Sequence, residues 1–157
     1  MKGISALDDR RIGIATTYGK PYFQFVKALK LLNLKYDSLL PTEIQDYSGN
    51  LIFTTEDESP KFASQEILNE EILKEDPTVL QGIIIEKLDS GLNQRELLIG
   101  IDPGQRIGLS VMYLGKEIER GLYTSPDALA SHVAKILGGL RAERKIVKLY
   151  GDRKSVV

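Results

Sequence analysis

The stretch "ELLIGIDPGQRIGLSV", residues 96–111, decides the fold of the second half of the chain. It begins as an apolar run typical of a buried strand, places Asp102 beside Pro103 and Gly104, and then resumes as a second apolar run. Pro103 fixes the backbone just after the carboxylate and favours an extended Asp102. The stretch therefore predicts two strands joined by a tight turn, with one carboxylate held at the end of the first strand.

The residues that follow predict the rest of this domain. After strands at 97–102 and 106–114, a short turn at Gly115-Lys116 predicts a hairpin with a third strand at 117–123. "TSPDALASHVAKILGGL" predicts a helix over 126–140, because Ser125 can cap it, Pro126 suits the first turn and apolar residues recur at helical spacing. A last strand is expected at 145–151, which gives the order β-β-β-α-β.

The first half predicts a separate small α/β domain. A strand at 11–16, a helix beginning near Pro21 and strands at 36–40 and 50–55 give a β-α-β-β pattern. Residues 59–90 favour helices, although the run "GIIIEKL" could also form a strand. The polar segment 89–94 is the expected linker, so we expect domains at 1–90, with trailing helices, and at 91–157.

Composition excludes several kinds of chemistry. The 157 residues contain no cysteine and a single histidine, His132, which excludes disulfides, thiol catalysis and multi-histidine metal sites. Any metal would need oxygen ligands, which favours magnesium or manganese. The N-terminus has no apolar signal region and no apolar run approaches 18 residues, so we expect a soluble, cytoplasmic protein with no membrane partner.

Charge is distributed unevenly along the chain. Residues 1–90 contain 10 Lys/Arg and 15 Asp/Glu, whereas residues 91–157 contain 11 Lys/Arg and 7 Asp/Glu. The basic character of the second half permits contact with phosphates, although a solvated surface explains it equally well. The residues that we expect to contact nucleic acid, if it binds, are Arg144, Lys148, Arg153 and Lys154.

The order β-β-β-α-β, with "IGIDPG" ending its first strand, resembles the RNase H-like superfamily, and most closely its RuvC-type Holliday-junction resolvases and their archaeal relatives. The resemblance covers residues 95–157 and predicts a partial RNase H-like domain after the small N-terminal α/β domain. The motif residues are Gly100, Ile101, Asp102, Pro103, Gly104 and Gly108. A similar Gly-Ile-Asp-x-Gly motif occurs in actin-like ATPases and sugar kinases, so an actin-like nucleotide-binding remnant is a further alternative.

The resemblance implies a metal site and a nucleic-acid substrate. Asp102 corresponds to the first metal-binding aspartate of these nucleases, in which Mg²⁺ or Mn²⁺ activates water to attack a phosphodiester of structured DNA or RNA. Asp152 is the best match to the second acidic residue, because a strand at 145–151 lying parallel to strand 97–102 would end beside Asp102. We therefore predict Asp102 and Asp152 as catalytic and metal-binding residues, with Gly104 and Gly108 shaping the turn.

Simpler explanations stay open for these residues. Asp102 could cap the turn by accepting backbone N–H groups, and "GDRK" around Asp152 could be an ordinary polar turn. His132 is expected at the surface or boundary of its helix. "TTYGKP", residues 16–21, lies between a strand and a helix but lacks the glycines and the Lys-Ser/Thr pair of a phosphate-binding loop.

The chain also departs from the resolvase pattern. It ends at Val157, just after the fourth strand, whereas the resemblance calls for further acidic residues beyond that point. We expect metal-dependent endonuclease activity to be incomplete in this chain. The alternative is a non-catalytic binding or regulatory module that contacts a protein partner or a second copy of itself.

Overall fold

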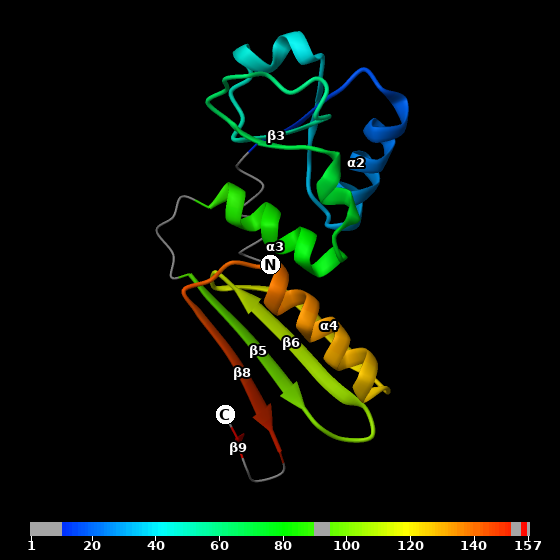
Figure 1. Ribbon diagram of the computed structural model, residues 1–157, viewed down its shortest axis with the longest axis vertical. Coiled ribbons are helices and arrows are strands. Elements are labelled where there is room, and N and C mark those ends of the chain that lie inside the picture. Colours follow the sequence, from blue (N-terminus) through cyan, green and yellow to red (C-terminus); the bar gives the residue numbers. More distant parts are fainter. Residues whose placement is uncertain (1–10, 90–94, 152–154, 157) are drawn as a thin grey trace. The chain divides into compact units, whose positions relative to one another are not determined.

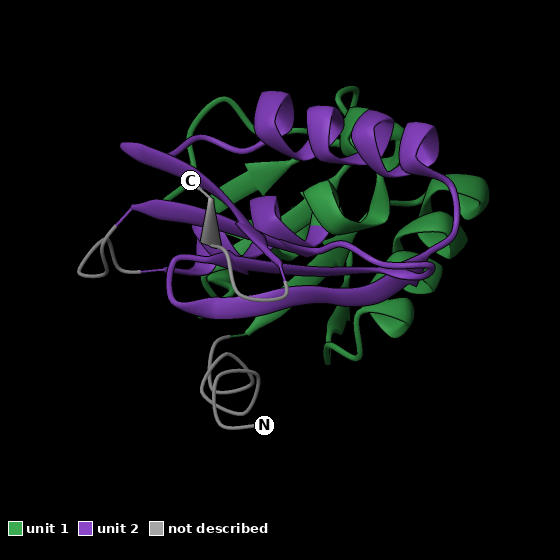
Figure 2. Cartoon of the chain, turned by 90° about the horizontal axis from the view of Figure 1, so that it is seen from below, with its two compact units in different colours: residues 1–80 green, residues 81–157 purple. Residues whose placement is uncertain are grey.

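The computed structural model describes residues 11–89, 95–151 and 155–156. The chain divides into two compact units, residues 1–80 and 81–157 (Figure 2). The division falls within α3 (Pro77–Leu88), and most of the expected linker at 89–94 lies outside the described residues. Each unit contains its own sheet, so the protein has a mixed α/β fold with two sheets (Figure 1).

The first unit is built on a parallel sheet with the strand order β2-β1-β3-β4. Its elements are β1 (Ile12–Ala15), α2 (Gly19–Leu31), β2 (Asp37–Leu39), the 3-10 helix η1 (Pro41–Asp46), β3 (Leu51–Thr54), β4 (Glu66–Leu68) and the 3-10 helix η2 (Glu70–Lys74). The central strands β1 and β3 are buried along their whole length, as expected for a parallel sheet covered on both faces.

Two elements cover this sheet. Phe25 of α2 is fully buried and packs against Phe53 of β3, with 5.3 Å between the ring centroids. Ile44 of η1 and Tyr47 belong to a second cluster with Ile52. The expected helix around Ile67 and Leu68 is wrong, because these residues form β4 beside β3. "GIIIEKL" lies in α3, which confirms the helical prediction.

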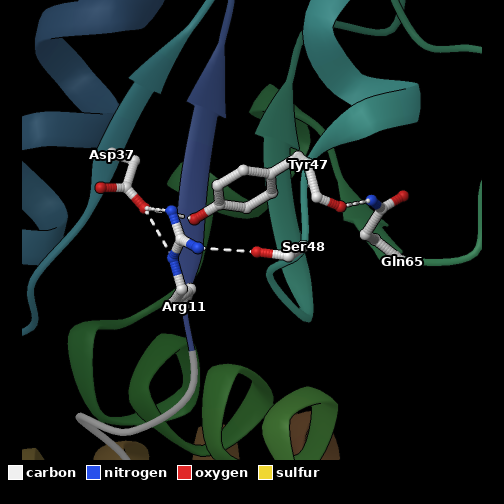
Figure 3. A network of polar contacts seen from close by, with 5 residues as sticks. All are labelled: Arg11, Asp37, Tyr47, Ser48 and Gln65. Carbon is white, nitrogen blue, oxygen red and sulfur yellow. Dashed lines mark hydrogen bonds and ion pairs between the residues drawn. The ribbon is translucent and has the colours of Figure 1, made fainter.

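A polar network ties the amino ends of these strands together (Figure 3). Arg11, just before β1, donates to the Asp37 carboxylate and to Ser48 Oγ at 3.3 and 2.6 Å. The Tyr47 hydroxyl donates to Asp37 at 2.6 Å, and Gln65 Nε2 donates to the Tyr47 carbonyl at 2.6 Å. Burial and the bond to Asp37 raise the pKa of Tyr47, so its hydroxyl stays protonated and continues to donate.

At the carboxyl ends of β1 and β3, a single carboxylate accepts hydrogen bonds from the residues that follow both strands. The Glu58 carboxylate accepts hydrogen bonds from the hydroxyls of Thr16, Thr17 and Thr55 at 2.5, 2.7 and 2.8 Å, and from the Thr17 amide at 2.8 Å. Burial opposes ionisation, but these donors outweigh it and lower the pKa of Glu58 to about 2. Ligands of open parallel sheets usually bind at this edge, and here the donors of the "TTYGKP" loop bind Glu58.

The second unit contains the mixed sheet β7-β6-β5-β8-β9. Its elements are β5 (Glu96–Asp102), β6 (Ile107–Tyr113), β7 (Lys116–Tyr123), α4 (Pro126–Gly139), β8 (Arg144–Tyr150) and β9 (Ser155–Val156). β6 is antiparallel to β5 and β7, whereas β8 is parallel to β5. The observed order β-β-β-α-β confirms the sequence prediction, and β9 is an added antiparallel strand.

Helix α4 supplies the crossover between β7 and β8. Ser125 Oγ accepts from the Ala128 amide at 3.1 Å, which confirms the predicted cap, and Leu129 and Ile136 are buried. The predicted hairpin also forms, because Leu114 and Gly115 both have positive φ and join β6 directly to β7. In the part of the chain that the structure describes, no helix is long and apolar enough to cross a membrane.

Replacing Glu58 with glutamine should destabilise the first unit by about 1–3 kcal/mol at pH 7, because the ionised acceptor of four hydrogen bonds is lost. The folded pKa of Glu58, about 2, lies below its ordinary value of 4.5, so its stabilising effect is complete above pH 4.5 and is lost as the pH falls towards 2. The gap between parent and Glu58→Gln should therefore close in acid. Urea unfolding, followed by the amide NMR signals of β1 and β3, measures it.

The matched control is Glu56→Gln, which removes the same charge from an exposed side chain in the same loop. It should leave stability unchanged at both pH values. If Glu58→Gln behaves like Glu56→Gln at pH 7, the hydrogen bonds to Glu58 do not stabilise the unit.

Candidate functional site

Side chains alternate along β5, and this alternation separates two faces of the second sheet. Leu97 and Ile99 are fully buried on the face that α4 covers, whereas Gly100 and Asp102 lie on the other face. We call this second face the open face. It presents Leu98, Gly100 and Asp102 of β5, Gly108, Ser110 and Met112 of β6, Arg120 and Leu122 of β7, and Arg144, Ile146, Lys148 and Tyr150 of β8.

Strand register arranges these side chains in rows across the sheet. One row consists of Arg120, Ser110, Gly100 and Lys148, from β7 to β8. The two middle positions carry small residues, and the two outer positions carry long cationic ones. The row is therefore low in the centre and flanked by positive charge on both sides.

The neighbouring row also has a glycine at its centre, but an apolar and an acidic residue take the place of the two cations. Leu122 pairs with Gly108, and Gly108 pairs with Asp102. Gly108 lies within β6, where an added Cβ would be 3.4 Å from the Asp102 Cβ. The missing side chain at Gly108 leaves the carboxylate open on that side. Asp102 itself is exposed at the end of β5.

The small residues of both rows form the floor of a cavity of about 670 Å³. We call this cavity the hollow. Its lining consists of Gly100, Asp102, Gly108, Leu109, Ser110, Arg120, Gly121, Leu122 and Tyr150. Small-molecule sites commonly enclose about 300–1,000 Å³, so the hollow is large enough for a ligand of that class.

Tyr150 leans over Gly100 from the end of β8. A Cβ added at residue 100 would lie 3.1 Å from Tyr150 Cε2 and 2.9 Å from Ser110 Oγ. Glycine at this position therefore allows the ring to approach the sheet. The Tyr150 side chain remains 43% exposed, so the ring borders the hollow and is still accessible to a ligand.

Two arginines of the open face make surface ion pairs. Arg120 pairs with Glu117 at 2.6 Å, and Arg144 pairs with Glu96 at 3.5 Å, with the two arginines 74% and 65% exposed. Exposed pairs of this kind contribute little and exchange readily with other partners. A phosphate could therefore replace Glu117 or Glu96 at small cost.

The predicted site residues are only partly described. Asp102 lines the hollow. Within the described residues its carboxylate makes no hydrogen bond or ion pair. It therefore does not cap the turn after β5, which was the alternative explanation for this residue. β8 ends beside Asp102, as expected from the parallel pairing. Asp152, Arg153 and Lys154 lie outside the described residues, so the pairing of Asp102 with Asp152 stays a prediction.

The remaining predicted residues are divided between the two ends of the sheet. Lys148 is on the open face one row from Asp102, and Gly104 lies in the connection between β5 and β6, whereas Arg144 pairs with Glu96 at the opposite end of β5. Within residues 11–89, 95–151 and 155–156, no group of three or more histidine, aspartate or glutamate side chains could hold a metal ion. Asp102 is therefore the one predicted metal ligand whose position the structure describes.

Sequence reasoning missed the packing of His132. Its Nε2 lies 2.6 Å from Glu119 Oε1, its ring stacks on Tyr123 at 5.8 Å, and the Tyr123 hydroxyl donates to Glu119 at 3.0 Å. The three half-buried side chains join α4 to β7 on the face away from the hollow. Glu119 and Tyr123 alternate with open-face residues along β7. This alternation was the sequence signal that could have placed both residues on the side of α4.

The chain matches no protein-family model, and it matches no curated protein. Among solved structures, Marinitoga piezophila Argonaute in complex with a 5′ OH guide RNA aligns with 91% of this chain at 10% identity and a TM-score of 0.32. The chain spans about a third of the length of that protein, since the alignment covers 36% of it. A TM-score this low does not establish a common fold.

Replacing Gly100 with alanine should push the Tyr150 ring away from the sheet, because the new methyl group would overlap the ring edge. NOEs between the ring protons and residue 100 should be present in the parent protein, and the chemical shifts of the ring protons should change in Gly100→Ala as the ring moves. The control is Gly138→Ala in α4, where an added Cβ meets nothing within 4 Å. Absence of these NOEs in the parent protein, or unchanged ring-proton shifts in Gly100→Ala, would contradict the close approach of ring and glycine.

Proposed function

We propose that the second unit is an RNase H-like nucleic-acid-binding module that contacts phosphates through its open face, with Mg²⁺ or Mn²⁺ at Asp102, and that does not cleave by itself. The observation that carries the proposal is the position of Asp102. An exposed carboxylate without a partner among the described residues borders a hollow that is flanked by Arg120 and Lys148.

The chemistry of this arrangement favours a metal-bridged phosphate. Hard divalent cations prefer carboxylate oxygens and usually complete their coordination with water and with substrate phosphates. Arginine and lysine bind the same phosphates directly, as charge-assisted donors. A carboxylate next to a row that ends in two cationic side chains can therefore hold a metal that a phosphate also binds. Asp152 is the second ligand in this proposal.

Cleavage makes further demands on the site. Two-metal phosphodiester hydrolysis needs two cations fixed about 3.5–4 Å apart, which takes several shared oxygen ligands. Among the described residues, no group of three or more carboxylate or histidine side chains could hold a metal ion. We therefore propose binding without efficient cleavage. A protein partner or a second copy of the chain that adds carboxylates would make the site catalytic.

Asp102→Asn should abolish most Mn²⁺ binding and the metal-dependent part of nucleic-acid binding, because the amide keeps the shape but not the charge. Glu143→Gln is the matched control, since it removes the same charge from an exposed residue just before β8, at the opposite end of the sheet from Asp102. Calorimetry with Mn²⁺ and fluorescence anisotropy with labelled branched DNA and RNA–DNA hybrids measure the two effects.

Salt dependence provides an independent readout. With about two to three phosphate contacts, affinity should fall roughly 10- to 40-fold between 50 and 200 mM salt. Equal Mn²⁺ affinity in Asp102→Asn and parent would reject the metal site. Nucleic-acid binding that is absent or insensitive to salt would reject the phosphate contacts. Robust Mn²⁺-dependent cleavage that disappears in Asp102→Asn would show that the chain is an enzyme.

A further inference from the structure

We propose that the hollow receives one unstacked base of a single-stranded nucleic acid, and that Tyr150 is the surface on which this base stacks. The inference rests on the proposed function, because it names the substrate class of the same face. It assigns Tyr150, Gly100 and Ser110 a binding role that differs from metal coordination by Asp102.

The Tyr150 ring has an unusual position for an aromatic side chain at the end of a strand. An aromatic side chain at the exposed end of a strand usually lies flat on its neighbours or points into solvent. Tyr150 instead leans over the one position of β5 that has no side chain, so its ring forms a wall of the hollow and stays 43% exposed. An accessible ring beside a cavity is the feature that single-strand binding proteins use to stack bases.

Polar and apolar side chains surround the Tyr150 ring in the hollow. Ser110 Oγ lies over the floor next to Gly100, and Asp102 lies at the rim. The Ser110 hydroxyl can donate or accept, so it can bind the polar edge of a base or a ribose hydroxyl without the Asp102 carboxylate. Leu122, 65% exposed, adds an apolar wall on β7.

Two positively charged side chains flank the floor of the hollow. Arg120 and Lys148 lie at the two ends of the row that crosses the floor, separated by three strand spacings of about 4.8 Å each. A base bound between them has its own phosphate on one side and the next phosphate on the other. The chain direction of the nucleic acid would then run across the strands, from β7 towards β8.

The same features favour a single strand over a duplex. Bases in a duplex are covered above and below by their neighbours, so an aromatic side chain cannot reach their faces without unstacking them. The hollow is also concave, which suits a protruding base more than a smooth helical groove. A duplex should contact only the cations of the open face and a metal at Asp102.

The test compares Tyr150→Leu with Tyr150→Phe in the 157-residue chain. The probes are a labelled single-stranded oligothymidylate, an abasic deoxyribose-phosphate oligomer of the same length and a duplex of the same length. Tyr150→Leu should weaken oligothymidylate binding by about 5- to 100-fold, the range expected for losing one stacked base. Tyr150→Phe keeps the ring and should bind as the parent does. Affinity for the abasic oligomer and the duplex should be equal in all three proteins.

Circular dichroism and the thermal unfolding midpoint establish that the variants fold. Equal oligothymidylate affinity in Tyr150→Leu and parent would overturn the stacking role, while salt-sensitive binding that depends on Asp102 would leave the proposed function intact. An equal loss on the abasic oligomer would also overturn it, because Tyr150 would then act on the shape of the face and not on a base. If the parent protein binds no oligomer, the proposed function and this inference both fail.

Discussion

Parallel pairing of β8 with β5 is the constraint on which the second unit depends. The pairing requires a crossover, and α4 supplies it by burying Leu129 and Ile136 against one face of the sheet. Because side chains alternate with a period of two, burying one set of residues assigns the other set to the open face. A one-residue slip of β8 would turn Lys148 and Tyr150 towards α4 and remove both from the hollow.

The two units use carboxylates at strand ends in opposite ways. In the first unit, Glu58 accepts four hydrogen bonds where the carboxyl ends of β1 and β3 meet, and its pKa is lowered to about 2. In the second unit, Asp102 has no such donors among the described residues. A satisfied carboxylate stabilises its own fold, whereas an unsatisfied one beside a cavity is available to a ligand. This contrast places the functional proposal in the second unit.

Much of the fold could be predicted from local sequence, and the reasons are physical. Ser125 and Pro126 mark the start of α4, and the two apolar runs in 96–111 mark two strands, because these signals depend on neighbours in the chain. The helix predicted around Ile67 and Leu68 was wrong, because two adjacent apolar residues fit a helical and a strand period equally well. The structure places them in β4, whose partner β3 is distant in sequence.

The candidate site was only partly predictable for the same reason. Asp102 stood out from its motif, but the hollow depends on register, which sets Ser110 between Arg120 and Gly100 and brings Tyr150 over the glycine. The contacts of Glu58 and of His132 likewise join residues far apart in sequence. No local pattern encodes such contacts, so they appear only once the strands are paired.

The most direct test of the account is a map of amide chemical-shift changes in the ¹⁵N-labelled chain on addition of a short oligothymidylate with Mg²⁺. The open face should respond, with the largest changes at residues 98–102, 108–112, 120–122 and 146–150, while buried residues of α4 and the strands β1 and β3 change little. Changes confined to α4 or to the first unit would contradict the claim that the open face of the second sheet is the functional surface.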